Sequence, residues 1–397
     1  MEQARPRASV EHPERAGTPA TPAGGGALQT VVELLAEAGV EVGGSRPFDM
    51  IIHHPQTADR VLARGSLGLG ESYMDGWWDC EQLDEFICRV LRARLDEKVG
   101  RSALMLQSVR SRLFNLQNLR RAWKVGEVHY DLGNDFFEAM LDARMVYTCG
   151  YWAQADSLEQ AQIDKLDLIC RKLGLEPGMR LLDIGCGWGS LMKFAAEHYG
   201  TQCVGLTISR EQAAYGAARC EGLPVEFRLQ DYREFNPSGG ERFDRVASIG
   251  MFEHVGHKNY RDYFAIARRS LADDGLFLLH TIGKNVRNSA TDPWIDRYIF
   301  PNGALPSLGQ ITDSTEGLFI IEDVHNFGAD YDRTLMAWHA RFEAAWPTFA
   351  ETYGERFHRM WRYYLLACAG TFRARSNQLW QLVLSPEGVA GGYRRPS

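Results

Sequence analysis

A glycine-rich loop directly behind an apolar run constrains the fold of this chain more than any other feature. The segment reads Leu181-Leu182-Asp183-Ile184-Gly185-Cys186-Gly187-Trp188-Gly189-Ser190, and apolar residues then recur with helical spacing. This order predicts a buried strand, a tight turn and the start of a helix. Glycines suit such a turn because some φ values must be positive and a ligand must approach the backbone closely. The alternative is an ordinary glycine-rich turn without a ligand.

The glycine spacing and the acid before it narrow the class of ligand. The glycines alternate as G-x-G-x-G, whereas dinucleotide-binding folds use G-x-G-x-x-G. An aspartate near the end of the strand is suited to the ammonium group of a ligand. Both features resemble the first motif of S-adenosylmethionine (AdoMet)-dependent methyltransferases. That resemblance implies cofactor contacts at Asp183, Gly185, Gly187 and Gly189.

Alternating strand and helix patterns continue around this loop. Alternation of this kind predicts an α/β fold with a doubly wound parallel sheet, and the resemblance narrows it to the Rossmann-like class I methyltransferase fold. We expect a helix over 158–173 and then strands at 180–184, 202–206, 224–229, 243–249 and 276–282. Later elements are a strand near 319–326, two helices over about 331–374 and a closing strand at 378–384.

The chain is expected to divide into four regions. Residues 1–26 have the composition of a disordered leader, and residues 27–97 form a smaller N-terminal α/β domain. A basic linker helix is expected over 98–126, before an AdoMet-dependent catalytic domain over 127–390. Within the N-terminal domain the pattern predicts a helix over 27–40, a strand over 48–53 and a helix over 83–95.

Length and composition exclude several classes of protein. With 397 residues, 45% hydrophobic and 24% charged, the chain has the balance of a large globular protein. Its apolar runs are shorter than the roughly 20 residues that cross a bilayer. The first 26 residues lack the apolar stretch of a secretory signal. The net charge of −7 argues against a nucleic-acid partner.

Cysteine usage points to a reducing compartment. The eight cysteines lack short paired spacings, which favours reduced thiols in the cytosol over a disulfide framework. Neither Cys-x-x-Cys nor a histidine-rich spacing occurs, so we expect no metal site. These observations predict a cytoplasmic protein.

Residues 98–126 contrast with the acidic balance of the whole chain. Apolar residues recur there at near-helical spacing, which predicts a basic amphipathic helix. Such a helix can lie on an anionic membrane surface; the alternative is an interdomain helix with a solvated basic face. The segment contains seven basic residues and no acid: Lys98, Arg101, Arg110, Arg112, Arg120, Arg121 and Lys124.

Polar side chains follow the second and third expected strands. In an open α/β sheet a ligand binds beyond the carboxyl ends of the strands. Thr207 and Gln212 stand where they can hydrogen-bond a ribose, although many methyltransferases carry an acid there. Asp231 offers a carboxylate for the adenine amino group, and Tyr232 offers a ring to cover the base. Each alone is more often a turn or cap residue, but their order along successive strand ends favours a cofactor site.

Six further segments identify a more specific resemblance. They are residues 70–78, 128–137, 145–152, 250–256, 279–283 and 326–331. Together they closely resemble the cyclopropane-fatty-acyl-phospholipid synthase family over roughly residues 60–385. The resemblance implies that AdoMet methylates a cis double bond of a phospholipid acyl chain, after which proton loss closes a three-membered ring. Apolar and aromatic walls suit this reaction because they protect a carbocation from water.

The resemblance also implies roles for particular residues. A bound bicarbonate is the implied base, held by Cys149, Glu253, His280, the backbone of Ile282, and Tyr331. The implied AdoMet contacts are Tyr130, Gly185, Gly187, Thr207, Gln212, Asp231 and Tyr232. Without the surrounding motifs, His280 would be read as a core histidine, Glu253 as a helix-cap acid and Cys149 as a small buried hydrophobe.

The resemblance also extends to Cys368. Cys368 matches a position regarded as active-site in similar proteins. The reaction needs no thiolate, however, and the segment around Cys368 is typical of an apolar helix, which favours a packing role.

The implied partners are membrane phospholipids with unsaturated chains, at the inner membrane surface, and a second subunit in a homodimer. The N-terminal domain is expected to dock lipid or to dimerise.

Three alternative functions remain open at this point. A sister enzyme with the same cation would give a methyl-branched or methylene acyl chain. A lipid-binding or carrier protein with a vestigial methyltransferase fold belongs to another class. A small-molecule methyltransferase is the third alternative, and it would not need the lipid-family motifs.

Overall fold

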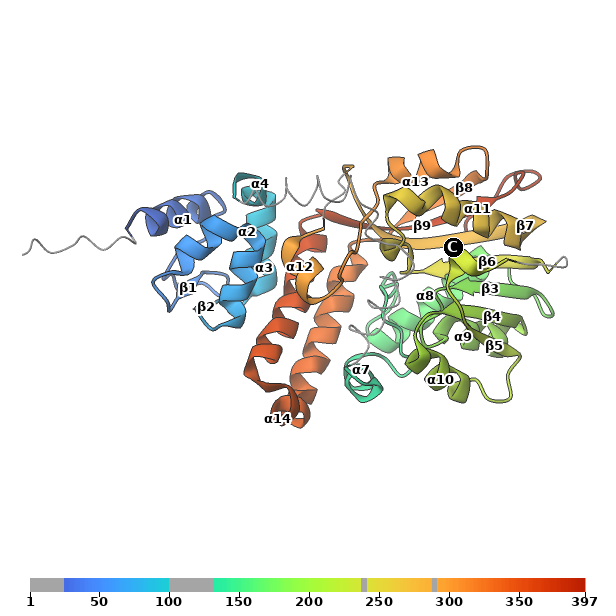
Figure 1. The fold of residues 1–397 in the computed structure, drawn as a ribbon, viewed down its shortest axis with the longest axis horizontal. Coiled ribbons are helices and arrows are strands. Elements are labelled where there is room, and N and C mark those ends of the chain that lie inside the picture. Colours follow the sequence, from blue (N-terminus) through green and yellow to red (C-terminus); the bar gives the residue numbers. More distant parts are fainter. Residues whose placement is uncertain (1–24, 100–131, 237–240, 288–290, 397) are drawn as a thin grey trace, which may run out of the picture.

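A seven-stranded, mostly parallel sheet forms the centre of the larger part of the molecule (Figure 1). The computed structural model describes residues 25–99, 132–236, 241–287 and 291–396. The strands are β3 (Arg180–Ile184), β4 (Gln202–Thr207), β5 (Val225–Leu229), β6 (Phe243–Ile249), β7 (Leu271–Lys284), β8 (Ile320–Asn326) and β9 (Asn377–Ser385). They lie in the order β5-β4-β3-β6-β7-β9-β8.

The strand order confirms the doubly wound fold. The chain runs outward from β3 to β5, then returns to the other side of β3 with β6, so the topological switch lies beside β3. β9 is antiparallel to both of its neighbours, whereas the other pairings within this sheet are parallel. The expected strands are all present. β7 begins earlier than expected because Leu271 pairs with Phe243 before a register shift.

Helices cover both faces of this sheet. Leu181 packs in one core with Leu166 and Ile169, whereas its neighbour Leu182 packs in a second core with Tyr263. Neighbouring strand residues point to opposite faces, so a strand covered on both sides has to be a continuous apolar run. The helices concerned are α8 (Leu158–Lys172), α9 (Ser190–Tyr199) and α10 (Arg210–Arg219) on one side, and α11 (Tyr260–Ser270) and α13 (Leu308–Thr315) on the other.

The N-terminal part is mainly helical. It consists of α1 (Gly25–Glu37), β1 (Ile51–Ile52), α2 (Thr57–Met74), β2 (Trp78–Asp79), α3 (Leu83–Arg92) and α4 (Leu95–Lys98). The strand expected over 48–53 is therefore reduced to two residues. The helix expected over 83–95 is interrupted because Arg94 has a φ of 56°, and α4 follows it. The leader up to residue 24, and the basic segment from residue 100 to 126, lie outside the described residues.

A long helical hairpin joins the N-terminal part to the sheet. α14 (Asp330–Arg373) contains the two expected helices, and Gly354, with φ 73° and ψ 165°, separates them. Its two halves lie between the N-terminal helices and the sheet (Figure 1). A Cβ at Gly370 would come within 2.6 Å of the Asp84 carbonyl oxygen, so α3 can approach this closely only because the residue is glycine. Two shorter helices, α7 (Asn134–Met140) and α12 (Pro293–Tyr298), flank the hairpin.

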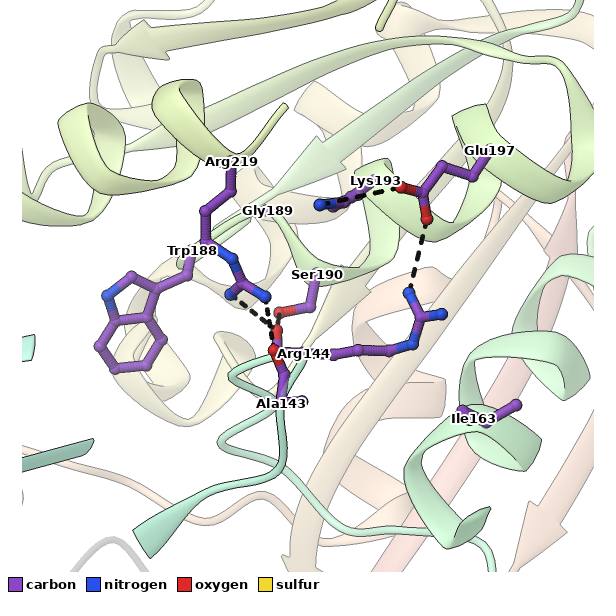
Figure 2. A pocket seen from close by; sticks show the side chains of 9 residues that line it. All are labelled: Ala143, Arg144, Ile163, Trp188, Gly189, Ser190, Lys193, Glu197 and Arg219. Carbon is purple, nitrogen blue, oxygen red and sulfur yellow. Dashed lines mark hydrogen bonds and ion pairs between the residues drawn. The ribbon is translucent and has the colours of Figure 1, made fainter. Parts of the chain in front are cut away.

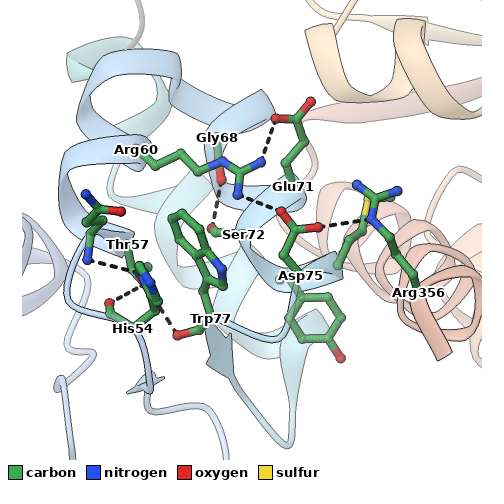
Figure 3. Close-up of polar contacts among 12 residues, drawn as sticks. His54, Thr57, Arg60, Gly68, Glu71, Ser72, Asp75, Trp77 and Arg356 are labelled. Carbon is green, nitrogen blue, oxygen red and sulfur yellow. Dashed lines mark hydrogen bonds and ion pairs between the residues drawn. The ribbon is translucent and has the colours of Figure 1, made fainter.

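A cluster of ion pairs adds to the apolar contact between these parts. Glu71 of α2 accepts hydrogen bonds from Arg60 (3.0 Å) and from the Tyr298 hydroxyl of α12 (3.0 Å). Asp75, at the end of α2, accepts from Arg60 (2.7 Å) and from Arg356 of α14 (3.0 Å), as Figure 3 shows. Glu71 is buried, so its charge depends on these donors.

We predict that Glu71→Gln lowers the free energy of unfolding by about 2 kcal/mol, because the partly buried arginine and tyrosine donors lose a buried charged acceptor. Urea unfolding measures the change. Glu37→Gln, which disrupts an exposed ion pair with Lys98, is the control and should cost less than about 0.5 kcal/mol. Equal costs for the two variants would contradict a structural role for the Glu71 cluster.

Candidate active site

The polar residues expected from the sequence meet at the carboxyl edge of the sheet. Asp183 lies in β3 and Thr207 is the last residue of β4. Asp231 follows β5, and Glu253 lies in a short turn, Phe252–His254, after β6. His280 of β7 pairs with Ile249, the last residue of β6, so it stands at the same edge. The sheet thus gathers groups that are up to about a hundred residues apart in sequence.

The glycine-rich loop is shaped by positive φ angles. Gly185, Gly187 and Gly189 have φ values of 84°, 54° and 79°. A Cβ at Gly185 would lie 2.4 Å from the Met251 side chain, and one at Gly189 would lie 2.3 Å from Phe227. A Cβ at Gly187 would meet no atom within 4 Å. The first and third glycines therefore allow close packing, and the middle one borders open space where a ligand can approach.

Asp183 presents an unsatisfied acceptor beside this loop. The residue is 2% exposed, and its Oδ1 atom has no hydrogen-bond partner. Burial raises the pKa of Asp183 to about 7, and the Lys165 ammonium acts in the opposite direction. A buried carboxylate without full partners fits a ligand that brings a cation or hydrogen-bond donors, such as the amino acid moiety of AdoMet.

The ends of β4 and β5 hold the remaining cofactor candidates. Thr207 and Gln212 are buried and lie 3.5 Å apart, Oγ1 to Oε1. Asp231 accepts from the Arg233 backbone N–H (2.9 Å) and from its guanidinium (2.6 and 2.8 Å). Its carboxylate is therefore already paired within the chain. The Tyr232 ring packs edge-on against Tyr263 at 5.5 Å between centroids. Tyr130 lies outside the described residues.

Glu253 is held by strand β7. The Ile282 backbone N–H donates to Glu253 Oε1 at 2.6 Å, whereas Oε2 is buried without a partner. The backbone of Ile282 thus orients the carboxyl group, which is 7% exposed. Burial raises the pKa of Glu253 to about 7, and the hydrogen bond from Ile282 partly offsets that rise. A carboxyl group in this state can accept or hold a proton near neutral pH.

His280 is buried two residues before Ile282 on the same strand. Gln381 Nε2 donates to His280 Nδ1 at 3.2 Å, and Nε2 of the imidazole has no partner. Burial lowers the pKa of His280 well below its usual value, with further lowering by Lys165 and Lys172. The imidazole is therefore neutral. With Nδ1 accepting, it offers an N–H donor at Nε2.

Tyr331 lies near both Glu253 and Cys149. Burial raises the pKa of Tyr331 well above its usual value, and the nearby Cys149 and Glu253 raise it further. Burial likewise keeps Cys149 a neutral thiol, with its Sγ 3.2 Å from the Gly150 carbonyl oxygen. Thr334 holds the chain around this cysteine, because its hydroxyl oxygen accepts from the Gly150 N–H (3.1 Å).

Aromatic rings connect the glycine-rich loop to Tyr331. Trp188 of the loop packs on Phe137 (5.1 Å between centroids), and Phe137 on Tyr147 (5.3 Å). Trp338 continues the series, 5.2 Å from Tyr147 and 6.1 Å from Tyr331. The rings form a continuous apolar wall with their polarisable faces enclosed. Such a wall excludes water and stabilises positive charge.

Cys368 lies in the second half of α14, half-buried against the core that α14 shares with the N-terminal helices. Burial raises the pKa of this thiol to about 12, so it is not a thiolate at neutral pH. The geometry suits packing, the role favoured by the sequence.

Sequence reasoning missed several buried polar residues. Lys165 and Lys172 are fully or almost fully buried in α8, and Gln381 is buried in β9. The two lysines are seven residues apart on the same helix face as Leu158 and Ile169, and this spacing could have indicated that they are buried. Gln381 interrupts an apolar strand, and this could likewise have indicated a buried polar residue.

In the part of the chain that the structure describes, no three His, Cys, Asp or Glu side chains are grouped to hold a metal ion.

A cavity of about 400 Å³ lies beside the glycine-rich loop (Figure 2). Glu253 and His280 are not among its lining residues. The charged side chains around this cavity form ion pairs or hydrogen bonds within the chain. Glu197 faces both Arg144 (3.6 Å) and Lys193 (3.7 Å), and Arg219 donates to the Ala143 carbonyl oxygen (2.6 Å). These contacts fix the turn before residue 145 against α9 and α10. The lining residues are Ala143, Arg144, Ile163, Trp188, Gly189, Ser190, Lys193, Glu197 and Arg219.

Comparison with known proteins gives consistent matches. The profile of the mycolic acid cyclopropane synthetase family matches residues 117–382. The cyclopropane-fatty-acyl-phospholipid synthase of Escherichia coli K12 is 56% identical over 363 residues, which cover 91% of this chain and 94% of that protein. The cyclopropane synthase MmaA2 from Mycobacterium tuberculosis aligns with a TM-score of 0.62 and 34% identity, covering 66% of this chain and 97% of that one. The mycolic acid cyclopropane synthase CmaA1, complexed with SAH and CTAB, aligns with a TM-score of 0.61 and 33% identity, with the same coverage.

The buried carboxyl group of Glu253 should make stability depend on pH. Its pKa rises from 4.5 to about 7 on folding, so the folded protein binds more protons than the unfolded chain between these values. Stability from this group is therefore full below pH 4.5 and is lost as the pH rises through 7. In Glu253→Gln this pH-dependent loss of stability is absent. The unfolding free energy of the variant minus that of wild type should therefore rise by up to about 3 kcal/mol between pH 4.5 and 7, since one pKa unit corresponds to about 1.4 kcal/mol.

Urea unfolding of both proteins at several pH values measures the difference. Other titrating groups, including Asp183, are present in both proteins, so their contributions to the difference in unfolding free energy cancel. Parallel curves from pH 5 to pH 8 would contradict a buried Glu253 with a raised pKa.

Proposed function

This chain belongs to the mycolic acid cyclopropane synthetase family, and from that membership we propose that it cyclopropanates unsaturated phospholipids with AdoMet. The observation that carries the proposal is the buried pair Glu253 and His280, each with an unpartnered polar atom, close to the aromatic wall. A pair of this kind is costly in a purely structural role and suits proton removal in a dry site.

AdoMet, when bound, supplies an electrophilic methyl group to the cis double bond. The chain's own contribution is placement and shelter. Asp183 and the open space at Gly187 fit the cofactor's amino acid part, and buried Thr207 and Gln212 fit its ribose. The buried aromatic series from Trp188 to Tyr331 would shelter a cationic carbon from water.

Bicarbonate fits the orphaned atoms beside β7. His280 Nε2–H is a hydrogen-bond donor without a partner. Glu253 Oε2 also lacks a partner, and it is an acceptor when the carboxyl group is ionised and a donor when Oε2 carries the proton. A small anion that can both accept a hydrogen bond and share a proton satisfies both atoms. Bicarbonate, when bound, supplies the base for ring closure. Tyr331 and Cys149 would complete its surroundings, and the backbone of Ile282 acts through Glu253, to which its N–H is bonded.

The alternative product is a methyl-branched or methylene acyl chain from the same cation. Glu253, His280 and Tyr331 together supply the base site that ring closure requires, and this favours ring closure. A lipid carrier with an inactive fold is disfavoured by the intact loop and by the stability that its buried charges cost.

The decisive experiment supplies methyl-labelled AdoMet and vesicles of unsaturated phospholipid to the purified protein. We expect fatty acids heavier by one CH2 that have lost the double bond and resist mild hydrogenation. Tyr331→Phe tests the site, and we expect a loss of activity of about tenfold or more with AdoMet binding kept. Products that retain a double bond would favour the methylene alternative, and no labelled lipid at all would refute the function.

We also propose peripheral association with the inner membrane surface and assembly as a homodimer. Support comes from the sequence of the basic segment and from the chemistry of a substrate that lies in a bilayer. Within the described residues, no helix combines the length and apolarity needed to traverse a bilayer. The N-terminal part, where Leu28 of α1 and Ile51 of β1 are exposed, is the proposed docking or subunit contact. Sedimentation velocity measures the oligomeric state.

Neutralising the basic segment should weaken membrane binding. Each arginine near an anionic surface contributes about 1 kcal/mol, so replacing Arg110, Arg112, Arg120 and Arg121 with glutamine should reduce vesicle affinity by up to about a thousandfold. Co-sedimentation with anionic and neutral vesicles measures this effect. Unchanged binding to anionic vesicles would contradict the role of this segment.

A further inference from the structure

Strands β7, β9 and β8 place three polar side chains in one row. Gln381 of β9 pairs with His280 of β7 on one side and with His325 of β8 on the other. Directly opposed residues on antiparallel strands point to the same face, so these side chains are neighbours. Lys172, the last residue of α8, meets them there. Gln381 and Lys172 are 0% exposed and His280 is 1% exposed, so each polar atom in the row needs a partner.

With Lys172 as an ammonium, the hydrogen bonds in this row have one consistent direction. Lys172 Nζ lies 2.8 Å from Gln381 Oε1 and 3.0 Å from His325 Nδ1. An ammonium group only donates, so the amide atom that faces it has to be the oxygen. The Gln381 NH2 group then faces His280 and donates to Nδ1. An imidazole that accepts at Nδ1 carries its proton on Nε2.

We propose that Lys172 and Gln381 are positioning residues that hold His280 in the Nε2–H tautomer, so that it donates to the anion of the active site. The inference rests on the proposed function and deepens it. The lysine sets the orientation of the amide, the amide sets the tautomer, and the tautomer leaves a donor directed at the site. His280 Nε2 is buried without a protein partner, as a donor reserved for a bound acceptor requires.

The surrounding charges are compatible with this arrangement. Burial lowers the pKa of Lys172 to about 7, while Asp323, 4.0 Å away, acts against that lowering. Both the ammonium and the neutral amine keep enough hydrogens to donate to Gln381 and His325. Lys165 adds a second positive charge near His280 and disfavours the imidazolium form. A neutral histidine is the form in which the choice of tautomer matters.

Gln381→Glu tests the inference with little change in size. A carboxylate cannot donate to Nδ1, so His280 has to donate from Nδ1 and carry an unprotonated Nε2. The new carboxylate also pairs with Lys172, which helps to preserve folding. Nitrogen NMR of protein labelled with ¹⁵N-histidine should show the unprotonated signal of His280 moving from Nδ1 to Nε2. His280→Asn identifies the signals.

Function should change in parallel with the tautomer. For Gln381→Glu we expect affinity for ¹³C-bicarbonate, measured by NMR titration, and kcat for lipid methylation to fall about 10- to 100-fold, with AdoMet affinity unchanged. Gln378→Glu is the matched control, because Gln378 is a buried glutamine on the same strand that contacts Arg375 and Asn326 instead. It should leave the His280 signals in place.

Lys172→Met provides a second route if Gln381→Glu does not fold. Loss of the ammonium leaves the amide free to rotate, so His280 should show both tautomers and bicarbonate affinity should fall by a smaller factor. A single unshifted Nε2–H tautomer in either folded variant would overturn the inference, as would unchanged bicarbonate affinity. If wild type makes no cyclopropane lipid while the tautomer still switches, the proposed function fails and the positioning role of the pair stands.

Discussion

Burial of ionisable groups that lack full partners is the constraint on which the site depends. Burial is the largest influence on the pKa of Asp183, Glu253 and His280, and it brings the two acids to about 7. Groups in this state cost stability, so a rigid sheet with both faces covered has to hold them in place. The same desolvation makes them useful, because they can exchange protons or bind charged ligands near neutral pH.

The aromatic core connects this site to the rest of the molecule. Tyr331 stacks on Phe372 from the second half of α14, with 4.5 Å between ring centroids. That half also packs against α3, through Gly370. One continuous core therefore includes the N-terminal helices, α14 and the wall of the site. Among the described residues, the N-terminal helices are thus joined to Tyr331 by packed side chains of α14.

Local sequence predicted the larger elements well and the short ones less well. Apolar runs such as residues 180–184 have to be strands because both faces of the sheet are covered. In the N-terminal part, by contrast, the strand expected over 48–53 shrinks to Ile51–Ile52, because its partner β2 is equally short. Asp231 follows strand β5 as expected, but its hydrogen bonds with Arg233 were not visible in the sequence, nor was the contact of Cys149 with the Gly150 carbonyl oxygen.

The sequence by itself determined the order of strands and helices, the glycine-rich loop and the residue types at the strand ends, because these follow from local periodicity and backbone geometry. Only the tertiary structure decided which buried atoms have partners. The antiparallel insertion of β9 between β7 and β8 brings Gln381 beside His280, and the end of α8 brings Lys172 to Gln381. Pairings between residues a hundred or more positions apart depend on register and packing direction, which no local pattern encodes.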